Sequence, residues 1–266
     1  MNLKAIQARI RSDSKLLPGK RSFLLKPKAK PKASVLLLHG FSASPWEVRE
    51  CGLMLQKKGY MVYAPRIAGH GAGRADFDSH GEAEWMATAE QAYAELYEAG
   101  KKMILIGHSA GGVLATRLAA LHQSQIRCLA LGAPAFHLAD PMAPFSRIPL
   151  VRFFRPALHF KMAMPDAQYW TLDYASSRVA ELVRAGLKGQ EAALKLSLPL
   201  LLMQARGDGL VSSRFNEALF LKIPSQHKSL MIYEAQEHNV FYRSNPLQRQ
   251  VFGKLSAFLS HPQEFS

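Results

Sequence analysis

Short runs of apolar residues recur along this chain, and they constrain its fold more than any other feature. Residues 35–38 (VLLL) and 103–106 (MILI) are continuous apolar stretches of the kind that buried parallel strands show. Further strands are predicted at 23–26, 60–64, 126–131, 198–204 and 229–233. Helical patterns separate most of them, at 44–59, 81–99, 110–122, 213–221 and 246–259. This alternation predicts an α/β domain whose mostly parallel sheet is covered by helices on both faces.

Two of the predicted helices begin with capping signals. Ser44 precedes a proline and stands three residues before Glu47, and Ser79 stands three residues before Glu82. A serine followed three residues later by glutamate is typical of a capping box at a helix start. We therefore expect both serines to cap these helices.

The alternation breaks between residues 137 and 197, where two core strands lie much further apart than an ordinary connection places them. This segment has a helical pattern at 175–185 and a mixed aromatic and basic cluster at 145–162 that includes Arg147, Arg152, Arg155 and Lys161. The cluster is interpreted as a lid that lies over the strand ends or as a segment that docks on anionic lipid. The chain thus divides into a basic arm with the first strand (1–33), a first core part (34–136), a lid insertion (137–197) and a second core part (198–266).

The positive charge is concentrated near the beginning of the sequence. The net charge is +14, and residues 1–32 contain ten Lys or Arg residues against one acid, Asp13. Such an arm is a solvated leader or a contact for an anionic membrane. A nucleic-acid partner is not expected, because no aromatic residue is interleaved with the charges before Phe23 and no nucleic-acid motif follows.

Hydropathy and cysteine usage predict a cytoplasmic protein. No apolar run approaches the ~18 residues that would span a membrane, and the first residues lack the apolar core of a signal peptide. Cys51 and Cys128 lie in a helical and a strand pattern, so we expect two buried thiols. The ten histidines show no metal-ligand spacing, and neither a metal nor another cofactor is predicted.

One serine, one acid and one histidine follow three of the predicted strands. Ser109 stands between Gly107 and Gly111 after 103–106, Asp208 follows 198–204, and His238 follows 229–233. Ligands bind outside the carboxyl ends of strands in open parallel sheets, so these side chains are expected to converge there. The rival acids Asp140, Asp166 and Asp173 lie inside the insertion, and the rival His227 precedes its strand.

Each of these residue types suits nucleophilic catalysis. A serine hydroxyl is a weak nucleophile until a base takes its proton, and a histidine with a pKa near ~6.5 does this at neutral pH. Asp208 would orient the His238 imidazole and stabilise its charged form. The backbone N–H groups of Phe41 and Ala110 are the expected oxyanion donors. His39, His70 and His108 are interpreted as structural.

With six motifs together, the chain resembles the serine hydrolases of the α/β-hydrolase fold. Within that fold it is most similar to the bacterial carboxylesterase and monoacylglycerol lipase group. The motifs are HGF at 39–41, SPWE at 44–47, APRIAGHG at 64–71, GHSAGG at 107–112, DGLV at 208–211 and the late His238. The resemblance implies an ester hydrolase with a lid and no cofactor. Glu237, directly before His238, and Arg206, near Asp208, depart from the family pattern and bear on the pH optimum.

The sequence thus predicts a serine-dependent hydrolase of short to medium acyl esters or monoacylglycerols, acting through an acyl-enzyme. A thioesterase or another acyl hydrolase stays open, because the triad does not select the leaving atom. A non-catalytic ligand-binding protein of the same fold also stays open. A peptidase is less favoured, because no acidic signature for a substrate amine is present.

Overall fold

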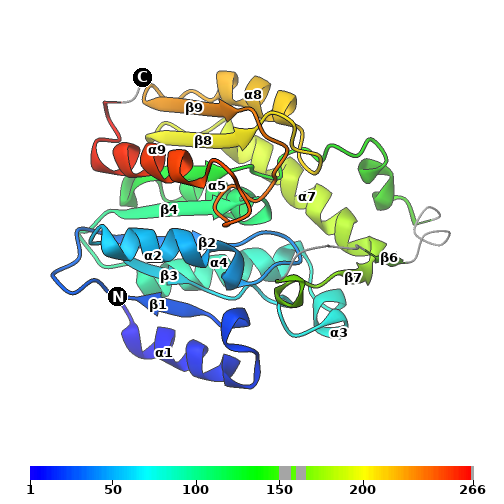
Figure 1. Cartoon of the computed structure of the whole chain (residues 1–266), viewed down its shortest axis with the longest axis horizontal. Coiled ribbons are helices and arrows are strands. Elements are labelled where there is room, and N and C mark those ends of the chain that lie inside the picture. Colours follow the sequence, from blue (N-terminus) through cyan, green and yellow to red (C-terminus); the bar gives the residue numbers. More distant parts are fainter. Residues whose placement is uncertain (150–156, 160–165, 265–266) are drawn as a thin grey trace.

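A central sheet of seven strands organises the molecule. The computed structural model describes residues 1–149, 157–159 and 166–264. The sheet has the order β1-β3-β2-β4-β5-β8-β9, in which only the edge strand β1 is antiparallel to its neighbour (Figure 1). The bounds are β1 Phe23–Leu25, β2 Ser34–Leu38, β3 Met61–Ala64, β4 Met103–His108, β5 Ile126–Gly132, β8 Leu200–Ala205 and β9 Lys228–Tyr233. The predicted fold class is confirmed.

Both faces of the sheet are buried, which is why its strands read as continuous apolar runs. Successive side chains of a strand point to opposite faces. In β2, Leu36 and Leu38 belong to one core cluster, whereas Val35 and Leu37 belong to the other. Because both faces of these strands are covered, apolar residues occupy successive positions. The alternation of apolar and polar residues that is usual in half-exposed strands is therefore absent.

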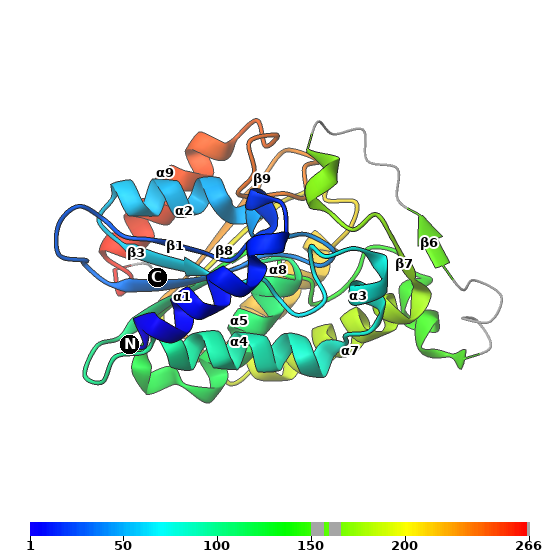
Figure 2. The same cartoon turned by 90° about the horizontal axis from the view of Figure 1, so that it is seen from below.

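Helices form a layer on each face (Figure 2). One layer consists of α2 (Arg49–Lys57) and α9 (Gln248–Ser260), whose apolar residues share a core cluster. The other consists of α1 (Leu3–Ser12), α4 (Glu82–Leu96), α5 (Ala110–Leu121), α7 (Ser176–Ala193) and α8 (Ser213–Lys222). A short helix, α3 (Arg74–Asp78), lies in the connection between β3 and α4.

The helix starts at Ser44 and Ser79 differ from the prediction. The Ser44 side chain makes no capping bond, and Glu47 instead accepts a hydrogen bond from the backbone N–H of Gly40. Helix α4 is capped from Gly81, whose N–H donates to Glu84, while Glu82 pairs with Arg117 and Lys188. Both predicted capping boxes are wrong because their glutamates bind groups distant in the sequence.

The basic arm is not a solvated leader. Its residues 3–12 form α1, where Ile6 is fully buried and Arg9 pairs with Glu95 of α4 at 3.2 Å. Asp13, the only acid of the arm, is also buried and accepts hydrogen bonds from Ser22. This segment therefore packs as part of the second helix layer.

The insertion between β5 and β8 has two parts. Its described residues before α7, among them the paired strands β6 (Ala157–His159) and β7 (Asp173–Ala175), lie beyond the carboxyl edge of the sheet (Figure 1). Helix α7 is longer than the predicted 175–185 and packs on α5, with Leu182 and Ala185 in the main core. Of the basic residues in the 145–162 cluster, Arg152, Arg155 and Lys161 lie outside the described residues.

Candidate active site

Ser109 occupies the sharp turn between β4 and α5. Its backbone lies at φ 53° and ψ −119°, a conformation that L-residues seldom adopt outside functional sites. The flanking glycines explain how the turn is possible. A Cβ at Gly107 would overlap the backbone of Gly111, and a Cβ at Gly111 would overlap the carbonyl oxygens of Leu38 and His39. The sequence GHSAGG therefore allows α5 to press against β2 and β4 while the serine stays at the carboxyl edge.

Asp208 and His238 are joined directly. Nδ1 of His238 lies 2.8 Å from Oδ2 of Asp208, and the second carboxylate oxygen accepts the backbone N–H groups of Leu210 and Val211. Burial on its own would raise the pKa of Asp208, but His238 and these N–H groups outweigh burial and lower it. The carboxylate thus stays ionised and fixes the orientation of the imidazole.

A cavity of about 400 Å³ brings the candidate residues together. Ser109 and His238 both line it, and so does Phe41 from the loop after β2. The remaining lining is mostly apolar and comes largely from the insertion and the β8–α8 loop, including Leu138, Ala143, Trp170, Leu172, Tyr174, Leu182, Leu210 and Val211. The site is therefore a mostly apolar pocket with a few polar groups in its lining, as in small-molecule sites generally.

The candidate oxyanion donors lie in the loop after β2 and at the start of α5. The ring of Phe41 packs edge-on against Phe77, Trp85 and Tyr174, with ring centroids 5.1 to 5.7 Å apart. Gly40 approaches the nucleophile closely, since a Cβ there would lie 3.1 Å from the Cβ of Ser109. Ala110 is the first residue of α5, where backbone N–H groups are free to bind an anion.

A buried ion pair lies beneath the site. Glu47 and His108 are almost fully enclosed, and Oε2 of Glu47 lies 3.1 Å from Nδ1 of His108. The same carboxylate oxygen accepts the N–H of Gly40 at 2.6 Å, and Nε2 of His108 lies 3.0 Å from the carbonyl oxygen of His238. The pair thus connects the loop of the oxyanion donor with the loop of the histidine.

The pKa values of the pair shift in opposite directions. Burial would lower the pKa of His108, but the Glu47 carboxylate outweighs burial and raises it. Burial would likewise raise the pKa of Glu47, but His108 and the N–H of Gly40 lower it. The Glu47 carboxylate and the protonated form of His108 therefore stabilise each other in the folded protein. Sequence analysis did not predict that Glu47 binds His108 and Gly40. The position of Glu47 in SPWE, shortly after the HGF loop, could have indicated a contact with that loop.

The other histidines near the site act as structural supports. Nε2 of His39 accepts the N–H of Ile67 at 3.2 Å, and burial lowers the pKa of His39 to about 4. His70 packs against His39, and burial lowers its pKa as well. Both rings are therefore neutral and hold the 64–71 loop against the oxyanion loop.

Most rival residues are engaged elsewhere. Asp166 binds Tyr242 and Arg243, and Asp173 pairs with Arg74 at 2.8 Å. His227 precedes β9, at the opposite end of that strand from His238. Asp140 does line the mouth of the cavity, where it accepts the N–H of Met142 at 2.8 Å.

The two departures from the family pattern have partners of their own. Arg206 pairs with Glu234 at 2.8 Å and not with Asp208. Glu237 accepts the backbone N–H of Asn239 at 3.0 Å. Within the described parts of the chain, no three acidic, histidine or cysteine side chains come together as metal ligands.

A family model described as "Serine aminopeptidase, S33" matches residues 29–244. The chain belongs to this family. It is 24% identical to the monoglyceride lipase of Rattus norvegicus over 89% of this chain and 85% of that one. It is 23% identical to the carboxylesterase of Bacillus subtilis (strain 168), over 77% of this chain and 84% of the relative.

Solved structures with the same fold include one described under "LipS and LipT, two metagenome-derived lipolytic enzymes". It has a TM-score of 0.82 and 20% identity, and the match covers 92% of this chain and 99% of that one. A soluble variant of the monoglyceride lipase from Saccharomyces cerevisiae matches with a TM-score of 0.75 and 17% identity, over 91% of each chain.

The protein is thus a serine hydrolase of the α/β-hydrolase fold, in the monoacylglycerol lipase and carboxylesterase group. The predicted class, a carboxylic ester hydrolase, is confirmed.

Proposed function

We propose that the protein hydrolyses short to medium acyl esters or monoacylglycerols through an acyl-enzyme on Ser109. The observation that carries the proposal is the cavity in which the strained serine and the Asp208-bound His238 both form the lining. A nucleophile, a base and a group that orients the base are the minimum that this chemistry needs.

Each residue has a defined role in the proposed reaction. His238 takes the proton of the Ser109 hydroxyl as the oxygen attacks the ester carbonyl, and it later returns the proton to the leaving alcohol. Asp208 holds the imidazole and stabilises the imidazolium. The N–H groups of Phe41 and Ala110 bind the oxyanion, and losing one such donor typically costs about 3 kcal/mol in the transition state. Water then releases the acid by the same steps, with His238 as the base.

The substrate preference rests on the shape of the cavity. At about 400 Å³, the cavity lies at the lower end of the range for small-molecule sites. Its apolar lining suits an acyl chain, and Ser42, Asn239 and Asp140 provide polar groups for a hydroxylated leaving group. The names of the curated relatives, monoglyceride lipase and carboxylesterase, support this substrate class.

Initial rates on p-nitrophenyl esters, from acetyl to palmitoyl, test the proposal with wild-type protein and Ser109→Ala. We expect turnover with an optimum at short or medium chains, and a fall of several orders of magnitude in the variant. A parallel series of acyl thioesters and of aminoacyl p-nitroanilides measures the thioesterase and aminopeptidase alternatives. Inert wild-type protein across the ester series, or equal rates for the variant, would rule the proposal out.

Location and membrane contact complete the proposal. Cys51 and Cys128 are free, buried thiols, which supports a reducing compartment and hence the cytoplasm. None of the helices in the described ranges has the length and apolarity to cross a bilayer. A weak contact with anionic membranes, made through the basic residues of 1–33 or through the lid, is also part of the proposal.

A further inference from the structure

A second cavity lies at the opposite edge of the sheet from Ser109. It has a volume of about 530 Å³, and its lining includes Ser34, Met61 and Met103, the first residues of β2, β3 and β4. Ser109 follows the last residue of β4, so a strand of about 20 Å separates the two sites. The proposed ester hydrolysis makes no use of this cavity.

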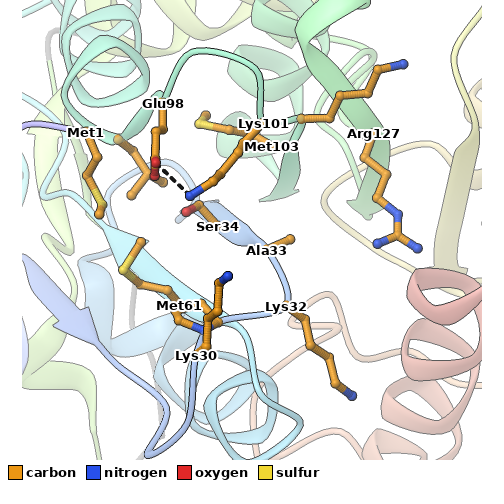
Figure 3. Close-up of a pocket in the computed structure, with 13 residues that line it drawn as sticks. Met1, Lys30, Lys32, Ala33, Ser34, Met61, Glu98, Lys101, Met103 and Arg127 are labelled. Carbon is orange, nitrogen blue, oxygen red and sulfur yellow. Dashed lines mark hydrogen bonds and ion pairs between the residues drawn. The ribbon is translucent and has the colours of Figure 1, made fainter.

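The lining of this cavity is strongly basic (Figure 3). Its only acidic side chain is that of Glu98, against five cationic side chains: Lys30, Lys32, Lys101, Lys102 and Arg127. The cations come from three separate parts of the sequence. Figure 3 shows Lys30 and Lys101 extending toward the middle of the group, with Lys32 and Arg127 at its margin. Folding has therefore gathered like charges around one hollow.

The protein itself compensates only part of this charge. Lys101 pairs with Glu98 at 2.6 Å, and the ammonium group of Lys32 lies 5.9 Å from the centre of the Tyr60 ring. One nitrogen of Arg127 donates to the carbonyl oxygen of Ser260 at 3.2 Å. By contrast, neither Lys30 nor Lys102 forms an ion pair with any residue in the described ranges.

We infer that this cavity binds a phosphate group. A phosphate monoester carries a charge of about −1.5 to −2 at neutral pH and offers three acceptor oxygens. Lysine ammonium groups bind phosphate as point charges, and the planar guanidinium of Arg127 adds paired donors. Because one carboxylate faces five cations, a bound anion would relieve repulsion that the folded protein otherwise bears.

The surroundings strengthen the attraction for an anion. Lys26, Lys28 and Lys57 line an adjoining hollow that has no acidic residue in its lining. Summed fields of this kind draw anions toward a site from several ångströms away and weaken with added salt. The phosphate belongs either to a soluble phosphorylated compound or to the headgroup of an anionic lipid. Only the lipid source rests on the membrane contact proposed above.

Calorimetric titration with inorganic pyrophosphate at low ionic strength measures binding of a soluble phosphate. Flotation with vesicles of phosphatidylcholine, with and without phosphatidic acid, measures binding of a lipid headgroup. The test variant is Lys30→Ala/Lys102→Ala. The matched control, Lys195→Ala/Lys222→Ala, removes the same charge from exposed residues that line neither this cavity nor the adjoining hollow. Both variants should retain wild-type esterase activity, because their substitutions lie at the far edge of the sheet.

We expect the test variant to bind at least one of the two probes about tenfold more weakly, and the control to stay within about twofold of wild type. If the test variant but not the control binds pyrophosphate more weakly, the ligand is a soluble phosphate. If only its binding to phosphatidic acid vesicles is weaker, the ligand is a lipid headgroup. The inference is overturned if the wild-type protein binds neither probe, or if both variants weaken binding equally. These results do not depend on the esterase assay, so failure of one proposal leaves the other intact.

Discussion

Two buried carboxylates hold the candidate active site together, and each does so through a histidine. Asp208 binds the side chain of His238, whereas Glu47 binds His108, which in turn contacts the carbonyl oxygen of His238. The first carboxylate binds the imidazole that is the proposed base. The second acts on the backbone that carries it. We therefore expect substitution of Asp208 to affect the reaction rate and substitution of Glu47 to affect the stability of the fold.

Asp208→Asn should lower kcat by about 10³- to 10⁴-fold with little change in KM. The amide cannot stabilise the imidazolium and favours the wrong tautomer of His238. Steady-state kinetics on the preferred ester measure this effect. Asp140→Asn is the control, because Asp140 lines the same cavity without contacting His238, and it should change kcat less than tenfold. Similar effects of the two substitutions would contradict the assignment of Asp208.

Glu47→Gln should destabilise the fold in a pH-dependent manner. Removing one partner of a buried ion pair typically costs about 3–5 kcal/mol in the free energy of unfolding. Because Glu47 raises the pKa of His108, this contribution is complete below the unfolded pKa of about 6.5 and is lost as the pH rises through the folded value. The difference from wild type should thus be larger near about pH 6 than near about pH 9.

Urea denaturation at the two pH values measures that difference. The exposed pair between Glu234 and Arg206 provides the control, and Glu234→Gln should change stability by no more than about 1 kcal/mol at either pH. An equal loss for Glu47→Gln at both pH values would mean that Glu47 does not raise the pKa of His108.

At the scale of elements, the contact between α5 and β2 decides where the nucleophile stands. Gly111→Ala places a methyl group against the backbone of Leu38 and His39, and backbone cannot move aside as a side chain can. We expect a loss of more than about 2 kcal/mol of stability, or no folded protein. Gly253→Ala in α9 is the control, since its methyl group meets no atom within 4 Å and should stabilise by about 0.5–1 kcal/mol.

Thermal denaturation compares the two glycine variants with wild type. A Gly111→Ala protein of wild-type stability would show that α5 is not held against β2 as closely as described.

Local patterns in the sequence predicted the strands well and the contacts of polar residues poorly. The runs at 35–38 and 103–106 are strands because burial on both faces leaves only apolar residues there. Glu47 and Glu82, in contrast, looked like capping residues, yet their partners His108, Arg117 and Lys188 are distant in sequence. Helix α1 was missed because the basic residues around it suggested a solvated segment, and because only one of its residues, Ile6, is buried.

The Ser, Asp and His candidates could be placed because each follows a predicted strand of a parallel sheet. Their position at one edge needed only the direction of the strands. The shape of the pocket could not be predicted, since Leu138, Trp170 and Tyr174 reach it from an insertion without a regular pattern.

On the scale of the whole molecule, the two edges of the sheet differ in chemistry. The carboxyl edge carries an apolar cavity with the serine, and the amino edge carries a basic cavity with five cationic side chains. Five of the 34 Lys and Arg residues thus line a cavity in which no step of the proposed hydrolysis takes place. The proposed ester site and the proposed phosphate site therefore lie in separate cavities at opposite edges of the sheet.

The central claim, an acyl-enzyme on Ser109, is tested most directly by covalent trapping. A fluorophosphonate reacts with an activated serine, and peptide mapping by mass spectrometry locates the adduct. We expect one adduct per chain, on Ser109, forming in step with the loss of esterase activity, and none in His238→Ala, which lacks the base. Loss of activity without an adduct on Ser109, or an adduct on another residue that accounts for the loss, would contradict the claim.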